Sequence, residues 1–422
     1  MRIPRRRFNP SSEILVIVCL SAFIDTLGYG LIVPFLPQYA MTLGATDFDL
    51  ALIFSSYALV QLVTVIPFGL MSDRYGRRPF MIAGMILLGV SSLLYPLARS
   101  VPLLVLGRAV QGLAASATWS SALALVADTY PGKDKGEKIG IAAGVTGVGG
   151  IAGPLVGGVL AQLNFNYPFL LSASFSLAVG VYMFFRLRET RGKTVVETLP
   201  YRQILRKALG IRNVIILIII NGLTTIFWGF LEPFMPPYLS GRFSLSSSQI
   251  GLVFGLASLT YAALRPLAGR LSDRYGRKKF IVGGMAALAV INLLIPFCND
   301  PVSLTLCIMA NSAVGTIAWT PLTPLAIESL QEGGVEAYAT ANSLFDLAYY
   351  VGYSVGPVIG ALMSSYLGFE SMFYFYTVTL VVVVIISQAY MQEIMKKKKR
   401  RKKQQKVAPT ISRKRKAAKN TR

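Results

Sequence analysis

The sequence predicts an all-α integral membrane protein whose twelve transmembrane helices form two pseudo-symmetric six-helix bundles. Hydrophobic residues make up 54% of the 422-residue chain and charged residues only 14%, whereas about 25% is usual for a soluble domain. The charged phrase GLMSDRYGRR at residues 69–78 also returns as GRLSDRYGRK at 269–278, 200 residues later. Two copies of one turn in an apolar chain indicate an internal duplication, and therefore two homologous halves around a shared interface.

Each predicted helix is an apolar run long enough to cross a bilayer, for which about 20 residues are needed. The first run is too long for a signal peptide and contains Asp25, so we expect it to remain in the protein. The runs divide into an N-terminal bundle over 14–186 and a C-terminal bundle over 213–392, joined by a linker over 187–212. In order, the predicted helices span 14–38, 49–71, 79–99, 101–127, 138–162, 167–186, 213–239, 249–270, 280–298, 301–327, 337–363 and 371–392.

The net charge of +23 belongs mainly to the two chain ends. Residues 396–422 hold 15 Lys or Arg and no Asp or Glu, and four arginines lie among the first seven residues, which leaves +4 (23 − 15 − 4) for the rest. We therefore expect a basic N-terminus over 1–13 and a basic, disordered tail over 393–422 near anionic lipids, with no nucleic-acid partner.

The basic loops also predict the orientation of the chain in the membrane. Cationic clusters occupy alternate connections: before the first helix, at 74–78, at 133–138, through 186–212, at 270–279 and after 395. Since positively charged loops stay on the cytoplasmic side, both termini are predicted to be cytoplasmic and the protein to lie in the cell membrane. We expect the basic linker to lie against lipid headgroups and the protein to act as a monomer.

The sequence offers no candidates for catalytic or metal chemistry. The chain has no histidine, and Cys19, Cys298 and Cys307 lie in or beside apolar runs without the spacing of metal ligands. We interpret these cysteines as packing residues. A Gly-rich phosphate-binding loop ending in Lys-Ser/Thr is absent, which disfavours ATP-driven transport. We therefore expect no enzyme activity, no cofactor and no bound metal.

The duplication extends beyond the charged turn. The segment PFLPQY at 34–39 matches PFMPPY at 233–238, and Trp119 matches Trp319. GPLVGG at 153–158 matches GPVIGA at 356–361. These pairs are 199, 200 and 203 residues apart, so nearly one offset relates the two halves.

With these motifs the chain resembles the major facilitator superfamily, over essentially its whole length apart from the tails. The repeated turn resembles that superfamily's cytoplasmic gating motif, and the resemblance implies a latch that opens and closes between transport states. A basic topogenic turn is the alternative, which would explain the arginines but not the repeated Asp and Gly. The implied gating residues are Asp73, Arg74, Gly76 and Arg77, with Asp273, Arg274, Gly276 and Arg277 in the second copy.

Three further segments resemble the twelve-helix drug:proton antiporters. They are LGYGLIVPFLP at 27–37, LVLGRAVQGLAA at 104–115 with Arg108 inside it, and GGIAGPLVGG at 149–158. An arginine at membrane depth is costly and therefore points to function, such as holding a carboxylate. The third segment matches the motif that this group associates with export, and its marked residues are Gly149, Gly153, Pro154, Gly157 and Gly158.

Three carboxylates in the apolar runs are the candidates for proton coupling and substrate binding: Asp25, Glu232 and Asp346. A desolvated carboxylate can exchange a proton for a cationic substrate, and neighbouring rings add cation–π attraction. The alternative is a carboxylate neutralised by Arg108 or Arg265 that serves packing only. The aromatic candidates are Tyr29 beside the first carboxylate and Tyr349, Tyr350 and Tyr353 beside the third.

Two acidic residues at predicted helix ends are further candidates. Asp128 and Glu328 stand 200 residues apart, at the cytoplasmic ends of the fourth and tenth helices. The shared offset makes them possible partners for the arginines of the repeated turn, although solvation of the interface is the commoner role. Trp119, Trp228 and Trp319 either line a central cavity or pack between helices.

Within the antiporters, the carboxylate placement is similar to that of the vesicular monoamine transporters and of prokaryotic multidrug and tetracycline exporters. The connection over about 39–48 is short and the chain has no glycosylation sequon, which favours a prokaryotic plasma-membrane protein. The resemblance implies a proton-coupled antiporter that exports small lipophilic, cationic compounds by rocker-switch alternating access. Two alternatives stay open: a proton-coupled carrier of a neutral or anionic metabolite such as a sugar or lysolipid, and a non-transporting membrane protein whose tail recruits a partner.

Overall fold

The computed structural model describes residues 10–130, 134–190, 201–334 and 338–393. Residues 1–9 and 394–422, which carry most of the predicted basic N-terminus and tail, lie outside the described residues. Within the described part, twelve helical segments are long and apolar enough to cross a membrane, which confirms the predicted all-α class.

In the first half, α1 spans Pro10–Ile32, α2 Leu36–Thr42, α3 Asp47–Tyr75, α4 Arg77–Leu97, α5 Val101–Thr129, α6 Asp134–Leu163 and α7 Asn166–Arg186. In the second half, α8 spans Tyr201–Leu209, α9 Arg212–Phe243, α10 Ser247–Tyr275, α11 Arg277–Leu294, α12 Pro301–Trp319, α13 Leu322–Glu332, α14 Tyr338–Leu367 and α15 Ser371–Tyr390. A short 3₁₀ turn over Ile295–Phe297 extends α11.

Matching caps show how the duplicated sequence starts matching helices. The Thr46 side chain accepts a hydrogen bond from the backbone of Asp49 at the start of α3, and the Asp49 side chain bonds back to Thr46. Ser246 and Gln249 form the same reciprocal pair at the start of α10. Such capping boxes satisfy amides that a helix start leaves without partners. The two halves therefore begin their second transmembrane helix in the same way.

Two predicted transmembrane helices are interrupted. The first splits into α1 and α2 around Pro34, and the tenth splits into α12 and α13 around Pro321. Proline has no backbone N–H and its ring clashes with the preceding helical turn, so each break follows from the sequence. Apolar periodicity alone did not reveal these breaks because the residues on both sides of each proline remain apolar.

The predicted linker also contains a helix that composition did not indicate. Leu205 and Ala208 of α8 pack against Val214, Leu330 and Leu344 at the end of the C-terminal bundle. The spacing of those two residues places them on one helix face, while Arg206 and Lys207 are exposed. The helical part of the linker, α8, is therefore docked to the second bundle rather than lying free.

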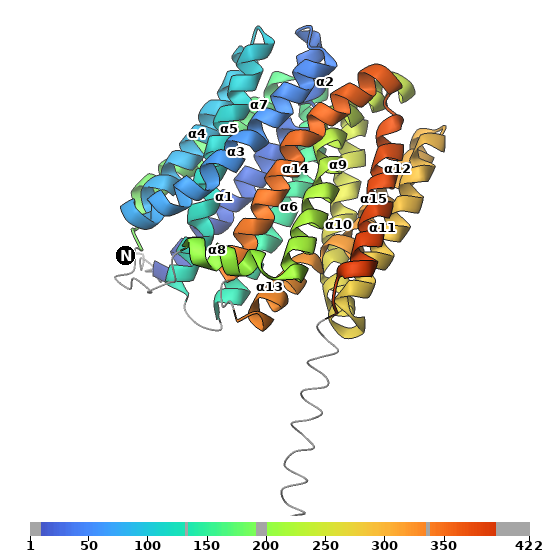
Figure 1. Cartoon of the computed structure of the whole chain (residues 1–422). Coiled ribbons are helices and arrows are strands. Elements are labelled where there is room, and N and C mark those ends of the chain that lie inside the picture. The colour runs from blue at the N-terminus through green and yellow to red at the C-terminus, as the bar shows by residue number, and fades with distance from the viewer. Residues whose placement is uncertain (1–9, 131–133, 191–200, 335–337, 394–422) are drawn as a thin grey trace, which may run out of the picture.

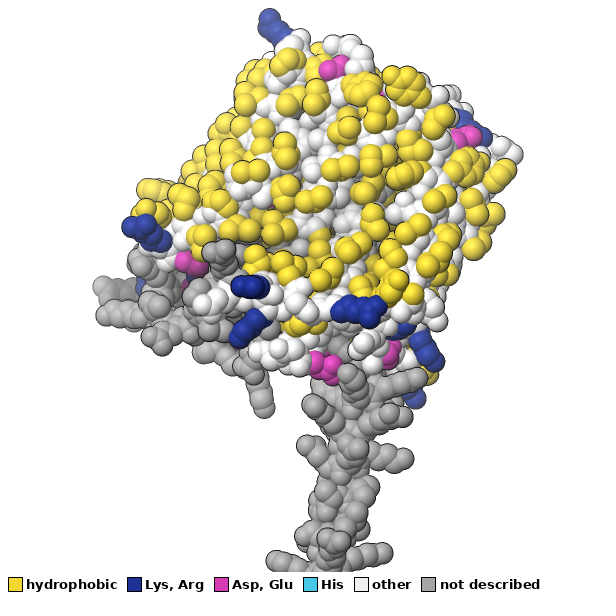
Figure 2. All heavy atoms as spheres, viewed as in Figure 1, with side chains coloured by type: hydrophobic (Ala, Val, Ile, Leu, Met, Phe, Trp, Pro, Cys, Tyr) yellow, Lys and Arg dark blue, Asp and Glu magenta, His cyan; other side chains and the backbone are white. Residues whose placement is uncertain are grey.

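The two bundles lean toward each other at one end (Figure 1). Helix α6 packs against α10, and α3 packs against α14, so these two helix pairs form most of the interface between the bundles. Both repeated turns, the start of α1 and the end of α15 lie at the lower end in Figure 1, and we call this the turn end. In Figure 2, hydrophobic side chains cover the middle of the visible face and Lys and Arg lie at its margins, as expected for a membrane belt.

The interface is closed at the end away from the turns. There, Ser55 of α3 donates a hydrogen bond to the backbone oxygen of Ser354 on α14 (2.6 Å), and the side chains of Asp47 and Ser365 approach to 3.5 Å. Along α6 the contact with α10 loosens toward the turn end: a Cβ on Gly158 would lie 2.8 Å from Ser247, and one on Gly147 would lie 3.9 Å from Ala262. A Cβ on Gly140 or on Gly144 would meet no atom of the described residues within 4 Å, so the space between these two helices opens at the turn end.

This closure predicts a cross-linking pattern. With all three native cysteines replaced by serine, Asp47→Cys with Ser365→Cys is expected to react rapidly with 1,2-ethanediyl bismethanethiosulfonate, because these side chains already meet. Gly140→Cys with Arg270→Cys, at the open end of α6 and α10, should react far more slowly. A protease site inserted within 191–200 lets gel mobility report the cross-link. Equal rates for the two pairs would contradict the arrangement.

Candidate functional site

A polar cluster joins the two bundles in the membrane-spanning region. Tyr29 of α1 donates a hydrogen bond to Oε2 of Glu232 on α9 (2.6 Å). Tyr353 of α14 donates to the same oxygen and also contacts the Tyr29 hydroxyl. The structure therefore brings three of the predicted residues together, and both contacts of the Tyr29 hydroxyl, with Glu232 and with Tyr353, cross between the halves.

Arg108 lies beside this cluster and is fully buried on α5. Its guanidinium faces the rings of Tyr29, Phe54 and Tyr57 at 5.5, 5.0 and 4.3 Å from their centroids. Its Nη1 donates to Oε1 of Gln111 (3.0 Å), the atom that also accepts from Tyr95. Cation–π attraction of this kind is strong where water is excluded. We name this arrangement the arginine cage.

No carboxylate pairs with Arg108 in this conformation. Within the described residues it has no ion pair at 4 Å or less, and its Nε and Nη2 are buried without hydrogen-bond partners. The expectation that it holds a carboxylate is therefore not met here. Arg265 is exposed, with its guanidinium over the Tyr261 ring, and it likewise has no ion pair with a carboxylate in the described part of the chain.

Asp25 and Asp346 occupy contrasting surroundings on opposite sides of the interface. Asp25 is 8% exposed, and its Oδ2 accepts a hydrogen bond from Nε1 of Trp119 (2.7 Å). Asp346 on α14 is exposed. The first predicted carboxylate is therefore bonded and shielded from solvent, whereas the third is accessible.

The remaining aromatic candidates form a stack on α14. The rings of Tyr349 and Tyr353 are stacked at 5.4 Å, and Tyr350 meets Tyr349 edge-on at 5.6 Å. Trp228 and Trp319 contact each other with ring centroids 5.6 Å apart. Among the described residues, Trp119 is the one tryptophan that bonds to a predicted site carboxylate. Aromatic side chains therefore bond to two of the three carboxylates, Trp119 to Asp25 and the two tyrosines to Glu232.

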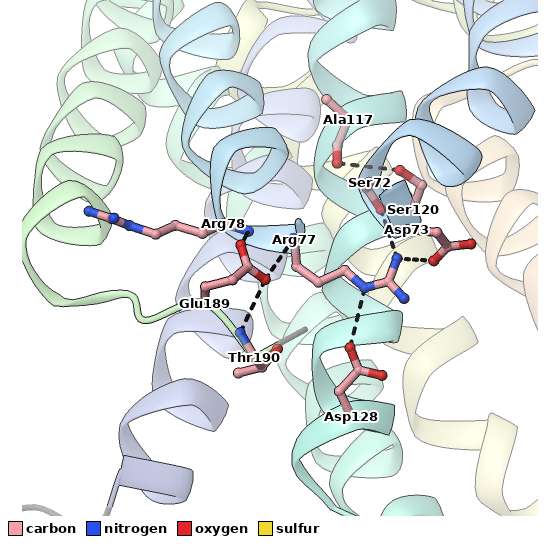
Figure 3. Close-up of polar contacts among 9 residues, drawn as sticks. All are labelled: Ser72, Asp73, Arg77, Arg78, Ala117, Ser120, Asp128, Glu189 and Thr190. Atoms are coloured by element: carbon pink, nitrogen blue, oxygen red, sulfur yellow. Dashed lines mark hydrogen bonds and ion pairs between the residues drawn. The ribbon is translucent and has the colours of Figure 1, made fainter. Parts of the chain in front are cut away.

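The repeated turns build two similar ion-pair clusters at the turn end, of which Figure 3 shows the first. Arg77 pairs with Asp73 and, through Nε at 3.3 Å, with Asp128 of α5. Arg277 pairs with Asp273 (2.8 Å) and with Glu328 of α13 (3.0 Å). The structure therefore shows the two acidic partners that the shared 200-residue offset suggested.

Each cluster stays within its own bundle. The partners of Arg77 come from α3 and α5, and those of Arg277 come from α10 and α13. The side chains of Asp73 and Asp273 remain 60% and 61% exposed. Arg74 and Arg274 lie over the neighbouring Tyr75 and Tyr275 rings instead of joining the clusters. In this conformation no described contact of the turns spans the two bundles.

Two glutamates complete these clusters and were missed in the sequence. Glu189 accepts hydrogen bonds from the backbone N–H groups of Arg77 (3.0 Å) and Arg78 (3.1 Å), as Figure 3 shows. Glu393 accepts from the backbone of Lys278 (3.0 Å). Each carboxylate thus binds free amides at a helix N-terminus, where negative charge is favoured. Their position in the sequence could have identified them, since each glutamate lies three residues beyond the last helix of its bundle.

The glycine of the repeated turn meets two requirements at once. Gly76 has a φ of +108° and Gly276 one of +112°, a conformation that residues with a Cβ rarely adopt. A Cβ on Gly76 would also lie 2.3 Å from the carboxylate of Glu189. The glycine is therefore needed both for the turn and for the approach of the acidic partner.

The predicted export motif forms the contact face of α6. Gly153 lies against the backbone of Gly30 on α1, and Gly158 lies against Ser247 and Gly251 on α10. Gly149, Pro154 and Gly157 also border α1. Small residues allow such close backbone approach. Helix α6 therefore packs tightly on α1 of its own bundle through one face and on α10 of the other bundle through an adjacent face.

Comparison with known proteins agrees with this arrangement. A family model described as "Major Facilitator Superfamily" matches residues 18–231 and 217–421. An uncharacterised MFS-type transporter of Methanocaldococcus jannaschii is 27% identical over 370 residues, covering 85% of this chain and 93% of the relative. The synaptic vesicular amine transporter of Rattus norvegicus is 27% identical over 335 residues, covering 76% and 62%. A bacterial homologue of the human lysosomal transporter Spinster, solved in an inward-facing and unoccupied conformation, has a TM-score of 0.78 at 16% identity, covering 90% and 98%.

The turn geometry predicts the effect of adding one methyl group. Gly76→Ala is expected to destabilise the protein by about 1–3 kcal/mol, because alanine is strained at this φ and collides with Glu189. Gly144→Ala is the matched control, since a Cβ there meets open space, and it should be neutral or slightly stabilising. Thermal unfolding in detergent measures both. An unchanged melting temperature for Gly76→Ala would refute the assigned role of the turn.

Proposed function

The chain belongs to the major facilitator superfamily, and from that premise we propose that it is a proton-coupled antiporter that exports small lipophilic cations by rocker-switch alternating access. The observation that carries the proposal is Asp25, which is 8% exposed, bonded to Trp119 and without a basic partner within 4 Å among the described residues. An ionised carboxylate there is uncompensated, so charge balance calls for a proton or a substrate cation.

The open turn end supplies the loading side of the proposed cycle. With both termini in the cytoplasm, a lipophilic cation enters from that side and displaces a proton at Asp25 or Asp346. Aromatic rings around these carboxylates favour a cation with apolar substituents. After the bundles rock, protons from outside return to the carboxylates and release the substrate. The similarity to a vesicular amine transporter supports an amine as the exported class.

The Tyr29–Glu232 hydrogen bond links this exchange to the motion. It joins α1 to α9, so a rocking movement that separates these helices must break or replace it. The carboxylate oxygen that it leaves is then available to a proton or a cation. In this proposal Glu232 and Tyr353 connect occupancy of the site to the position of the two bundles.

The repeated turns serve as the latch of the opposite state. Asp73 and Asp273 have exposed side chains in the present conformation, so they can form contacts between the bundles when the turn end closes. The pairs of Arg77 and Arg277 with Asp128 and Glu328 hold each turn in shape meanwhile. We assign the protein to the cell membrane, as a monomer with its basic linker near anionic lipids.

One observation favours a second candidate function. Arg108 is buried with two nitrogen atoms that have no hydrogen-bond partner among the described residues. A guanidinium in that state is a possible receptor for an anionic group of a substrate. A carrier of an anionic metabolite would use Arg108 for the substrate and the carboxylates for the proton alone.

Proteoliposomes with an imposed pH gradient distinguish these functions. Wild type is expected to accumulate cationic dyes and amines in exchange for protons, and not sugars or organic anions. Asp25→Asn should reduce coupled accumulation at least about tenfold, because a charge-assisted contact of roughly 1.5–3 kcal/mol is lost. Asp300→Asn, at an exposed helix cap, is the matched control. Undiminished coupling in Asp25→Asn would reject the assigned role, and gradient-driven movement of anions alone would favour the second candidate.

A further inference from the structure

We propose that a cavity inside the C-terminal bundle binds the cationic end of the substrate, as the unfilled counterpart of the arginine cage. This inference rests on the proposed function, because it takes the substrate to be a cation. The cavity encloses about 40 Å³. The residues that carry the argument are Trp228, Phe254, Ala257, Ile295, Ile308 and Asn311.

The duplication relates the wall of this cavity to the arginine cage, residue by residue. Counterparts lie 199 residues apart between the first and seventh transmembrane helices, and 200 apart between the second and eighth, third and ninth, and fourth and tenth. Under these offsets, Tyr29, Phe54, Tyr57, Tyr95, Arg108 and Gln111 correspond to Trp228, Phe254, Ala257, Ile295, Ile308 and Asn311. Every one of these six counterparts lines the cavity.

Three replacements account for the empty space. The guanidinium of Arg108 gives way to the shorter Ile308, the phenol of Tyr57 to the methyl group of Ala257, and the phenol of Tyr95 to Ile295. The aromatic walls are retained, with Phe254 in place of Phe54 and Trp228 in place of Tyr29. The second bundle therefore keeps aromatic walls like those of the cage, but it has no counterpart of the Arg108 guanidinium that fills the cage in the first bundle.

The chemistry of the remaining wall suits an external cation. Indole and phenyl faces attract ammonium and guanidinium groups, with tryptophan the strongest of the rings. Asn311 is 5% exposed, and its Nδ2 has no hydrogen-bond partner among the described residues. In the first bundle the matching amide, Gln111, accepts a hydrogen bond from the resident guanidinium through its oxygen. Because the unpartnered Nδ2 is a donor, the Asn311 carboxamide would offer a cation the same acceptor after a rotation that brings its Oδ1 into that place.

Size and position limit what can bind. A water molecule needs roughly 10–15 Å³ of such space, so about 40 Å³ accommodates roughly three water-sized groups. That matches a guanidinium or small alkylammonium head, and not a whole aromatic ring. Trp228 is one helical turn from Glu232 on α9, so a carboxylate lies close by along the same helix. The substrate class is therefore an amine, quaternary ammonium or guanidinium compound whose head enters this cavity.

Protection of an introduced thiol tests this binding directly and does not require transport. In a full-length chain with the native cysteines replaced by serine, Ala257→Cys is labelled with N-ethylmaleimide in the presence of benzyltrimethylammonium or its uncharged isostere neopentylbenzene. We expect the cation to protect at concentrations at least about tenfold lower than the isostere. Ala263→Cys, an exposed position on the same helix, should be labelled equally under all conditions.

Variants of the wall identify the source of the preference. Trp228→Leu should raise the half-protecting concentration of the cation roughly tenfold, whereas Trp228→Phe should leave it nearly unchanged. Asn311→Leu should raise it roughly 2–10-fold. Asn292→Leu is the matched control, because Asn292 is also a buried amide but does not line the cavity. Asp25→Asn should not alter protection.

The outcomes separate this inference from the proposed function. Equal protection by the two compounds, or protection that Trp228→Leu leaves intact, would identify the cavity as an apolar packing gap and overturn the inference. Cation-selective protection in a protein that transports no cation would uphold the cavity and reject the proposed export.

Ala257→Tyr, which restores the residue of the first bundle, is the second test. It should abolish the high-affinity binding of radiolabelled benzyltrimethylammonium without lowering the melting temperature.

Discussion

The hydrogen bond from Tyr29 to Glu232 is the contact on which the polar interior depends. It joins the two bundles through a carboxylate in the membrane-spanning region, and Tyr353 binds the same oxygen. A polar group buried at that depth is costly unless it is satisfied. Tyr353 belongs to the same bundle as Glu232, whereas Tyr29 belongs to the other. A movement that separates Tyr29 from Glu232 therefore removes one of the two described donors to this oxygen and leaves Tyr353 in place.

The duplicated halves have diverged in their interiors far more than at their ends. At the turn end the two clusters agree in their aspartate, arginine, glycine and helix-capping glutamate. Inside, one half holds a buried arginine among aromatic rings, and the other holds a cavity among the corresponding positions. A gate must move in the same way on both sides, whereas a binding site for an asymmetric molecule has no such constraint. In the proposed transport cycle, the residues that are alike in the two halves would serve motion and those that differ would serve recognition.

The sequence predicted features that repeat at a fixed offset between the two halves. It did not predict features that depend on how side chains approach one another in three dimensions. The twelve spans followed from length and hydropathy, and the partners of Arg77 and Arg277 followed from the 200-residue spacing of Asp128 and Glu328. Glu189 and Glu393 were missed because they are 204 residues apart and lie beside the linker and the tail, where charge is ordinary. The sequence did not predict the cavity, because the cavity arises where side chains of the second bundle are smaller than their counterparts in the first. Comparing Arg108 with Ile308 would have indicated it, but only a structure shows that the neighbours leave the space unfilled.

The difference between the arginine cage and its counterpart also explains why a cation would bind in the second bundle rather than in the first. In the first bundle a permanent positive charge already occupies the aromatic box, so a second cation there would meet direct repulsion at low dielectric. In the second bundle the box is neutral, and Glu232 lies one turn from its tryptophan. Asp25, across the interface, offers the opposing negative charge. If the protein transports cations as proposed, Asp25 and the second bundle would each offer the cation a stabilising environment, whereas the cage of Arg108 would repel it.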